Sequence, residues 1–178
     1  IQKYAPALRA DPLPIILPLG ISFFVFEFIH YLADVYKGQT PIRSPLRFGL
    51  FAAFFPSQIA GPIKRFEDFD QQALLPKRFD PTLFQNGIIL IIQGLFKKVA
   101  LGDNLAPLVN LGFAHSGQLA FVDAWAASLA FTLQIYYDFS GYTDIGRGSA
   151  NLLGYKLPEN FNMPYMARSV SEFWHRWH

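Results

Sequence analysis

Four long apolar segments constrain the fold of this chain more than any other feature of its sequence. They cover residues 13–36, 48–63, 83–101 and 121–139. Glu27 is the only formal charge between Leu13 and Ala33, and the second segment carries no charge at all. Because a helix rises about 1.5 Å per residue, roughly 20 apolar residues can cross a hydrocarbon core about 30 Å thick. The segments therefore predict helices that lie in a membrane.

The composition agrees with a membrane environment and excludes several functional classes. Hydrophobic residues make up 52% of the 178 residues. Charged residues make up 16%, whereas a typical soluble domain has about 25%. The net charge is only +2 and no run of lysine and arginine occurs, so no nucleic-acid partner is expected. Cysteine is absent, which excludes disulfides, thiolate metal ligands and cysteine nucleophiles.

Prolines and glycines indicate where the helices begin or bend. Pro18 and Gly20 suggest a bent start to the first segment. Pro56 interrupts the second segment, which is too short for a full span, so we expect it to be kinked or re-entrant. Asp80 followed by Pro81 is a natural N-cap and first residue for the helix of the third segment.

The ends of the third and fourth segments are marked by a change to polar residues. Lys97 and Lys98 are expected to close the third span as basic anchors. The fourth segment is long and free of turn signals, which favours a helix, and the chain becomes polar and rich in small residues after Phe139. The predicted fold class is therefore all-α, a polytopic integral-membrane helical bundle with kinked or re-entrant helices.

The end of the sequence gathers the residues best suited to chemistry. Residues 171–178 contain two tryptophans and two histidines, in a helix expected to begin near Ser169 or Ser171. In a helix, Trp174 and His178 would share a face, because they are four residues apart. A histidine side chain suits proton transfer near neutral pH. His175 and His178 have the spacing of a metal pair, but surface or packing histidines are commoner, and no metal site is expected.

Two pairs of charged or polar residues within the apolar segments have alternative readings. Glu27 and His30 could line a pore, or could form a structural pair that is hydrogen-bonded to each other. Asp138 and Asp144 could line a substrate passage. Alternatively, Asp138 could cap a break in the helix while Asp144 is solvated.

The remaining candidates are basic residues outside the apolar segments. Lys64 and Arg65 could meet an anionic head group or substrate, or could be simple anchors beside a span. His115 lies beside Ser116 and Gly117 and is expected to be a loop residue. Serine-hydrolase, phosphate-loop and zinc-protease motifs are all absent from the sequence.

Seven short blocks, in this order, resemble the membrane-bound O-acyltransferase family. They are LPLGISFF (17–24), YLADVYKG (31–38), QIAGPI (58–63), GLFKKV (94–99), DFSGYTD (138–144), PENFNMPY (158–165) and EFWHRWH (172–178). Each block alone is weak, but seven in sequence across essentially the whole chain are a specific signal.

The resemblance implies a fold, an activity and a location. It implies helices around a tunnel through a bacterial inner (plasma) membrane, in contact with membrane lipid. It implies transfer of an acetyl group from a thioester donor, acetyl-coenzyme A or another acyl thioester, with no bound cofactor. The acceptors would be hydroxyls of an extracytoplasmic polysaccharide such as alginate, and polysaccharide acetylation proteins would be partners.

The resemblance also assigns roles to residues. His178 matches the first of two family histidines and is the catalytic candidate. The second histidine and further spans are expected outside these residues, so residues 1–178, which begin with Ile1, are interpreted as one internal fragment of a single acyltransferase domain, inactive alone. The substrate-binding candidates that remain are Trp174, Trp177, Asp138, Ser140 and Asp144.

Two other classes of function stay open from the sequence. A transporter or channel subunit could use Glu27, His30, Asp138 and Asp144 as an ion path, although no inverted repeat is visible. A non-catalytic membrane scaffold could bind partner acyltransferases.

Overall fold

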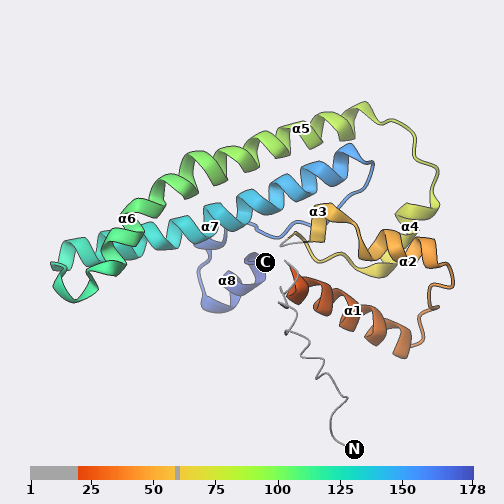
Figure 1. The fold of residues 1–178 in the computed structure, drawn as a ribbon, viewed down its shortest axis with the longest axis horizontal. Coiled ribbons are helices and arrows are strands. Elements are labelled where there is room, and N and C mark those ends of the chain that lie inside the picture. Colours follow the sequence, from red (N-terminus) through yellow and green to blue (C-terminus); the bar gives the residue numbers. More distant parts are fainter. Residues whose placement is uncertain (1–19, 59–60) are drawn as a thin grey trace, which may run out of the picture.

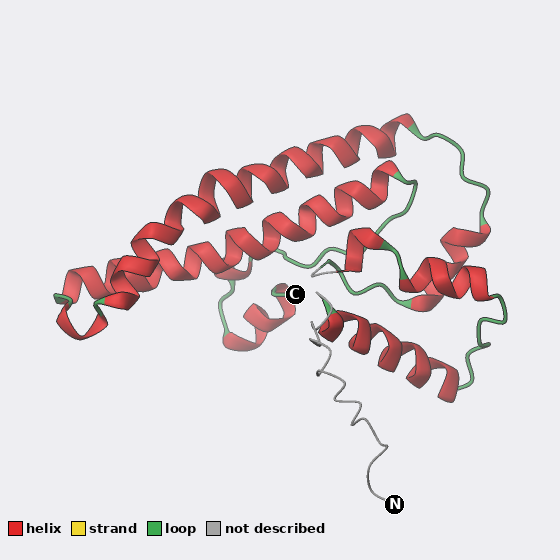
Figure 2. Cartoon of the chain, viewed as in Figure 1, coloured by secondary structure: helices red, strands yellow, loops and turns green. Residues whose placement is uncertain are grey.

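The computed structural model describes residues 20–58 and 61–178, and their regular structure is helical (Figures 1 and 2). The α-helices are α1 (Ile21–Tyr36), α2 (Pro45–Ala52), α3 (Phe55–Gln58), α4 (Phe66–Leu74), α5 (Pro81–Leu95), α6 (Asp103–Ala114), α7 (Phe121–Leu152) and α8 (Val170–Arg176). A π-helix, η1 (Phe96–Gly102), and two 3₁₀ turns, η2 (Ser116–Gln118) and η3 (Pro164–Met166), complete them. The described ranges contain no β-strand beyond one isolated bridge, so the all-α prediction is confirmed.

The helices α5, η1 and α6 follow one another as a long arm that runs antiparallel beside α7 (Figure 1). Asp80 caps the start of this arm as predicted, because its Oδ1 accepts hydrogen bonds from the backbone N–H groups of Thr82 and Leu83 at 2.9 and 3.1 Å. The arm does not end at Lys97 and Lys98. Helical structure continues through η1 into α6, so the prediction that these lysines close the third segment was wrong.

Glycines set the distance between this arm and α7. Gly87 and Gly94 lie two turns apart on α5, and Gly141 and Gly148 lie two turns apart on α7. A Cβ atom added to Gly94 would lie 2.5 Å from the carbonyl oxygen of Gly141, and one added to Gly148 would lie 2.6 Å from that of Gly87. Small residues of this kind let helix backbones approach closely, as they do in membrane proteins.

The helix α7 extends well past the expected end of the fourth segment. It continues from Phe139 to Leu152, through the glycine-rich residues that a single helix would tolerate poorly. The close packing against the arm overrides that low helix propensity. Asp138 therefore lies inside a continuous helix, and the reading in which it caps a break was wrong.

The helices α1 to α4 gather beside the far end of α7 around an aromatic core (Figure 1). Phe51, Phe54, Phe66 and Phe69 are buried there with Tyr155 from beyond α7. The second apolar segment is interrupted, as predicted. The break falls at residues 53–54, between α2 and α3, and Pro56 lies inside α3.

No described helix by itself corresponds to one of the membrane spans that the apolar segments predict. None of the helices within residues 20–58 and 61–178 combines the length and the apolar character needed to cross a membrane. The described part of the first segment is α1, with 16 residues. Pro18 lies outside the described residues, whereas Gly20 adopts φ 80° at the start of α1, a left-handed conformation that favours glycine.

The glycine contacts predict a strong asymmetry between two alanine substitutions in the full-length protein. Gly94→Ala should destabilise the protein by about 1–3 kcal/mol, because its Cβ would overlap the α7 backbone. Gly49→Ala in α2 is the matched control, because a Cβ there would have no atom within 4 Å. It should be neutral or stabilising by up to about 1 kcal/mol. Thermal unfolding in detergent measures both, and equal melting temperatures would contradict this packing.

Candidate active site around His178

The helix α8 is fixed by its N-terminal cap. Ser169 is the N-cap, and its Oγ accepts a hydrogen bond from the backbone N–H of Glu172 at 3.1 Å. The Glu172 carboxylate in turn accepts from the backbone N–H of Arg168 at 2.7 Å and from the Arg176 guanidinium at 2.7 and 3.0 Å. These donors lower the pKa of Glu172. Of the two serines considered from the sequence, Ser169 is the cap.

The helix ends at Arg176, before the catalytic candidate. Trp177 is extended and forms the isolated bridge with Phe161, and the backbone N–H of Asn162 donates to the carbonyl of Arg176 at 2.9 Å. His178 therefore lies outside the helix, with φ 39°. The prediction that Trp174 and His178 share a helical face was wrong, because pairing with residues 161–162 draws the chain out of the helix.

Three phenylalanine rings surround the imidazole of His178. The ring centroids of Phe139, Phe23 and Phe161 lie 4.7, 6.3 and 6.3 Å from that of His178. These rings come from α7, α1 and the segment between α7 and η3, respectively. Within the described ranges the imidazole has no hydrogen-bond or ion-pair partner, and the residue as a whole is exposed on the side that the rings do not cover. Burial against the rings lowers the pKa of His178, which favours the neutral imidazole.

The two tryptophans occupy different surroundings. Trp177 is half-buried, and its ring packs against Phe161 at 5.0 Å and Phe173 at 5.5 Å, and against two tyrosines. One of these, Tyr165 of η3, donates a hydrogen bond from its hydroxyl to the Thr132 carbonyl of α7 at 2.6 Å, which holds η3 against that helix. Trp174 is 64% exposed. The structure thus places Trp177 in the wall beside His178 and leaves Trp174 at the surface.

Asp138 and Asp144 form ion pairs with the lysines of the neighbouring arm. Asp138 accepts from Lys98 at 2.8 Å, and Asp144 accepts from Lys97 at 2.6 Å. Asp144 is buried and also lies 3.5 Å from Arg147, so the reading in which it is solvated was wrong. The lysine partners were not predicted from the sequence. The signal that could have found them is two adjacent lysines and two aspartates on or just beyond apolar segments, where unpaired charges are costly.

These aspartates and His178 lie on opposite faces of α7. Asp138 faces the arm, since a Cβ added to Gly102 would lie 2.7 Å from its Oδ1, whereas Phe139 contacts His178. Successive helical residues are rotated by about 100°, so Phe139 lies about 100° from Asp138 and about 140° from Asp144 around the helix. Ser140 is 1% exposed, and its hydroxyl has no partner among the described residues. The structure therefore does not bring the aspartates to the imidazole.

Glu27 and His30 do not pair with each other. Glu27 is buried and accepts from the Lys64 ammonium at 2.7 Å, while His30 lies 3.4 Å from Asp34. Lys64 is also buried, at 3% exposure. The structural-pair reading of Glu27 and His30 and the surface reading of Lys64 were therefore both wrong.

The other histidine and arginine candidates lie away from His178. Arg65 is the exposed N-cap residue of α4. His115 follows α6 directly, where its Nδ1 lies 3.0 Å from the Leu111 carbonyl. His175 is exposed on α8. Within residues 20–58 and 61–178, no group of three potential metal-ligating side chains forms.

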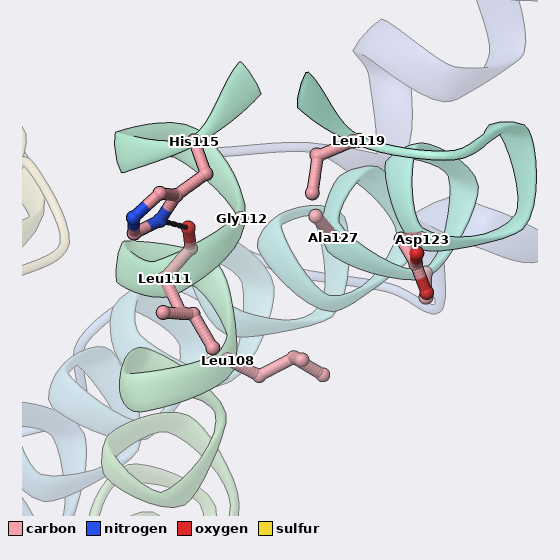
Figure 3. A pocket seen from close by; sticks show the side chains of 8 residues that line it. Leu108, Leu111, Gly112, His115, Leu119, Asp123 and Ala127 are labelled. Carbon is pink, nitrogen blue, oxygen red and sulfur yellow. Dashed lines mark hydrogen bonds between the residues drawn. The ribbon is translucent and has the colours of Figure 1, made fainter. Parts of the chain in front are cut away.

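A groove lies at the tip of the α6–α7 hairpin (Figure 3). Its volume is about 410 Å³ and its lining is mainly apolar. The lining residues are Leu108, Leu111, Gly112, His115, Leu119, Asp123, Ala126 and Ala127. Because this tip is the end of α7 remote from Phe139, the groove does not belong to the His178 site.

The capping geometry predicts different effects for two serine substitutions in the full-length protein. Ser169→Ala should destabilise α8 by about 1 kcal/mol, because the helix loses its N-cap acceptor. Ser171→Ala, inside the same helix, is the matched control and should change the stability little. Hydrogen exchange of the backbone amides of residues 170–173 measures the difference. Equal exchange in the two variants would mean that Ser169 does not hold the helix.

Comparison with known proteins identifies the family. A profile of the membrane-bound O-acyltransferase family matches residues 23–178. "Probable alginate O-acetylase AlgI" of Azotobacter vinelandii is 46% identical over 165 residues, which cover 92% of this chain and 33% of that protein.

More distant relatives act on other polymers, as their names state. "Peptidoglycan O-acetyltransferase" of Helicobacter pylori is 38% identical over 94% of this chain and 37% of that protein. "Teichoic acid D-alanyltransferase" of Bacillus subtilis is 31% identical over 97% of this chain and 45% of that protein. The chain thus spans about a third of the length of the alginate relatives. The chain belongs to the membrane-bound O-acyltransferase family.

Proposed function

We propose that this chain is part of a membrane O-acetyltransferase that modifies hydroxyls of an extracytoplasmic polysaccharide such as alginate. The observation that carries the proposal is the imidazole of His178, held by three phenylalanine rings and free of any internal partner in the described ranges. Family membership and the names of the alginate relatives support the reaction class and the acceptor.

We further propose that the chain lies in the bacterial inner membrane, as one internal part of a single polytopic domain. Large apolar side chains remain exposed along the arm and along the first half of α7. They include Ile88, Ile92, Leu95, Val99, Leu111, Phe113, Trp125 and Leu129. A surface of this kind is suited to lipid or to further helices. We propose that further spans and a second histidine lie outside these residues, as the resemblance implies.

The neutral imidazole supplies the chemistry that acyl transfer needs. It offers one N–H donor and one nitrogen acceptor. The donor can polarise the carbonyl of the thioester, and the acceptor can orient the attacking hydroxyl. In the transfer, the acceptor oxygen bonds to the carbonyl carbon, the carbon–sulfur bond breaks, and the hydroxyl proton ends on the departing thiol. General-base assistance to such a step contributes about 10²- to 10⁴-fold, and we assign the principal base to the second family histidine.

Trp177 is the expected substrate-site residue that the contacts support most directly. Trp177 packs against Phe161, whose ring contacts the imidazole, so the two residues give that side of the site an apolar surface. Exclusion of water strengthens the polar interactions of a reacting group. Asp138 and Asp144 are engaged with lysines. Trp174 and Ser140 remain proposals without a contact to the imidazole. These paired charges also give no support to an ion path through Glu27 and the two aspartates.

His178→Ala in the full-length protein should abolish polysaccharide acetylation without loss of the protein from the membrane. His175→Ala is the matched control, because His175 is an exposed histidine three residues away. It should keep near wild-type activity. The measurement is the O-acetyl content of the polymer per amount of membrane-inserted enzyme. Wild-type acetylation by the His178 variant would favour the non-catalytic scaffold instead.

The pKa of His178 should report its contact with the aromatic rings. Burial lowers the pKa of His178, so the neutral imidazole persists below the ordinary value of about 6.5 and is lost only as the pH falls through the lowered pKa. NMR titration of the His178 imidazole in the full-length protein should therefore give a pKa below about 6.5. Phe139→Ala removes the nearest ring and should move that pKa upward. An unchanged pKa in this variant would disprove the link.

A further inference from the structure

A buried ion pair lies within the group of helices next to the candidate site. The Lys64 ammonium donates to a carboxylate oxygen of Glu27 at 2.7 Å and to the hydroxyl of Ser57 at 2.9 Å. These three residues are 3%, 4% and 1% exposed, respectively. They join α1, α3 and the segment that leads into α4.

Stability alone explains this group poorly. Moving two charged groups out of water costs several kcal/mol per ion, and well-packed apolar residues often replace a buried ion pair without loss of stability. The second carboxylate oxygen, Oε1 of Glu27, is buried and has no partner among the described residues. The ion pair is therefore better explained by the way it holds α1, α3 and the segment before α4 relative to one another.

The ion pair is linked to His178 through two of the rings that contact the imidazole, those of Phe23 and Phe139. On α1, Phe23 lies four residues before Glu27 and therefore on the same face of the helix, and its ring contacts His178. On the other side, α3 packs tightly on α7, since a Cβ added to Gly146 would lie 2.5 Å from the Pro56 carbonyl oxygen. The same helix α7 carries Phe139, the ring nearest to His178.

We propose that Glu27, Lys64 and Ser57 are positioning residues, which hold α1 against α3 so that Phe23 closes on the imidazole of His178. They act through Phe23 and do not touch the reacting atoms. The inference rests on the proposed function, in which His178 is the catalytic residue.

The first test compares two variants of the full-length protein, with acetyl-coenzyme A as donor and alginate as acceptor in membrane vesicles. Glu27→Asp keeps the carboxylate charge beside Lys64 and should retain more of the wild-type kcat than the double variant. The double variant E27L/K64M removes both charges and the hydrogen bonds. Its kcat should fall at least about 10-fold with KM nearly unchanged, because misplacement by about 1 Å can cost up to roughly 100-fold.

The second test asks whether the effect travels through Phe23. In a Phe23→Ala background, E27L/K64M should lower kcat little further, because the wall that it positions is already absent. Multiplicative effects would show that the ion pair acts by another route and would overturn the proposal. If E27L/K64M does not accumulate in the membrane, Ser57→Ala replaces it in the same cycle, since that variant leaves the Lys64–Glu27 pair in place and removes only the two hydrogen bonds of the Ser57 hydroxyl, from Lys64 and to the Phe54 carbonyl.

A control separates positioning from general stability. Arg47 and Asp70 form another ion pair, between α2 and α4. The variant R47Q/D70N should lower the melting temperature but leave kcat per folded enzyme unchanged. Wild-type kcat in E27L/K64M would overturn the inference alone, provided that wild type is active and His178→Ala is inactive in the same assay. An inactive wild type, or an active His178 variant, would instead contradict the proposed function.

Discussion

The close contact between α5 and α7 is the constraint on which the rest of the structure depends. Gly94 and Gly141 bring the two backbones so near that a Cβ at either position would overlap the other helix. This proximity lets the short reach from Lys97 to Asp144 form a 2.6 Å ion pair. It also allows α7 to continue for 32 residues despite its glycines, because tertiary packing supplies what helix propensity does not.

As a consequence, the two faces of α7 make different kinds of contact. The face toward the arm carries the glycines and the paired aspartates, and it holds the two long helices together. The opposite face carries Phe139, which contacts His178, and Gly146, against which α3 packs. The helix α7, which contacts the imidazole of His178, is thus held in place by the arm on its other face. Rings from three separate segments contact the imidazole in this arrangement.

The sequence predicted best the features that depend on neighbouring residues. The N-cap at Asp80 and the capping serine near α8 follow local rules, and both are present. The chain direction at His178 was missed, because residues 161–162 lie far away in sequence and pair with the end of α8 only in the folded chain. The partners of Glu27 and of the aspartates were missed for the same reason. A rule that buried charges must pair states the need for a partner but does not identify it.

By itself, the sequence determined the helical class and the blocks that resemble the family, and it singled out His178 as a candidate, since apolar length, capping residues and short motifs are patterns of neighbouring residues. Only the tertiary structure decided which charges meet, where α7 ends and which rings contact His178. The physical reason is that an ion pair or an aromatic contact depends on the approach of whole helices. That approach depends on small residues such as Gly94, which matters because the backbone of α7 lies directly against it.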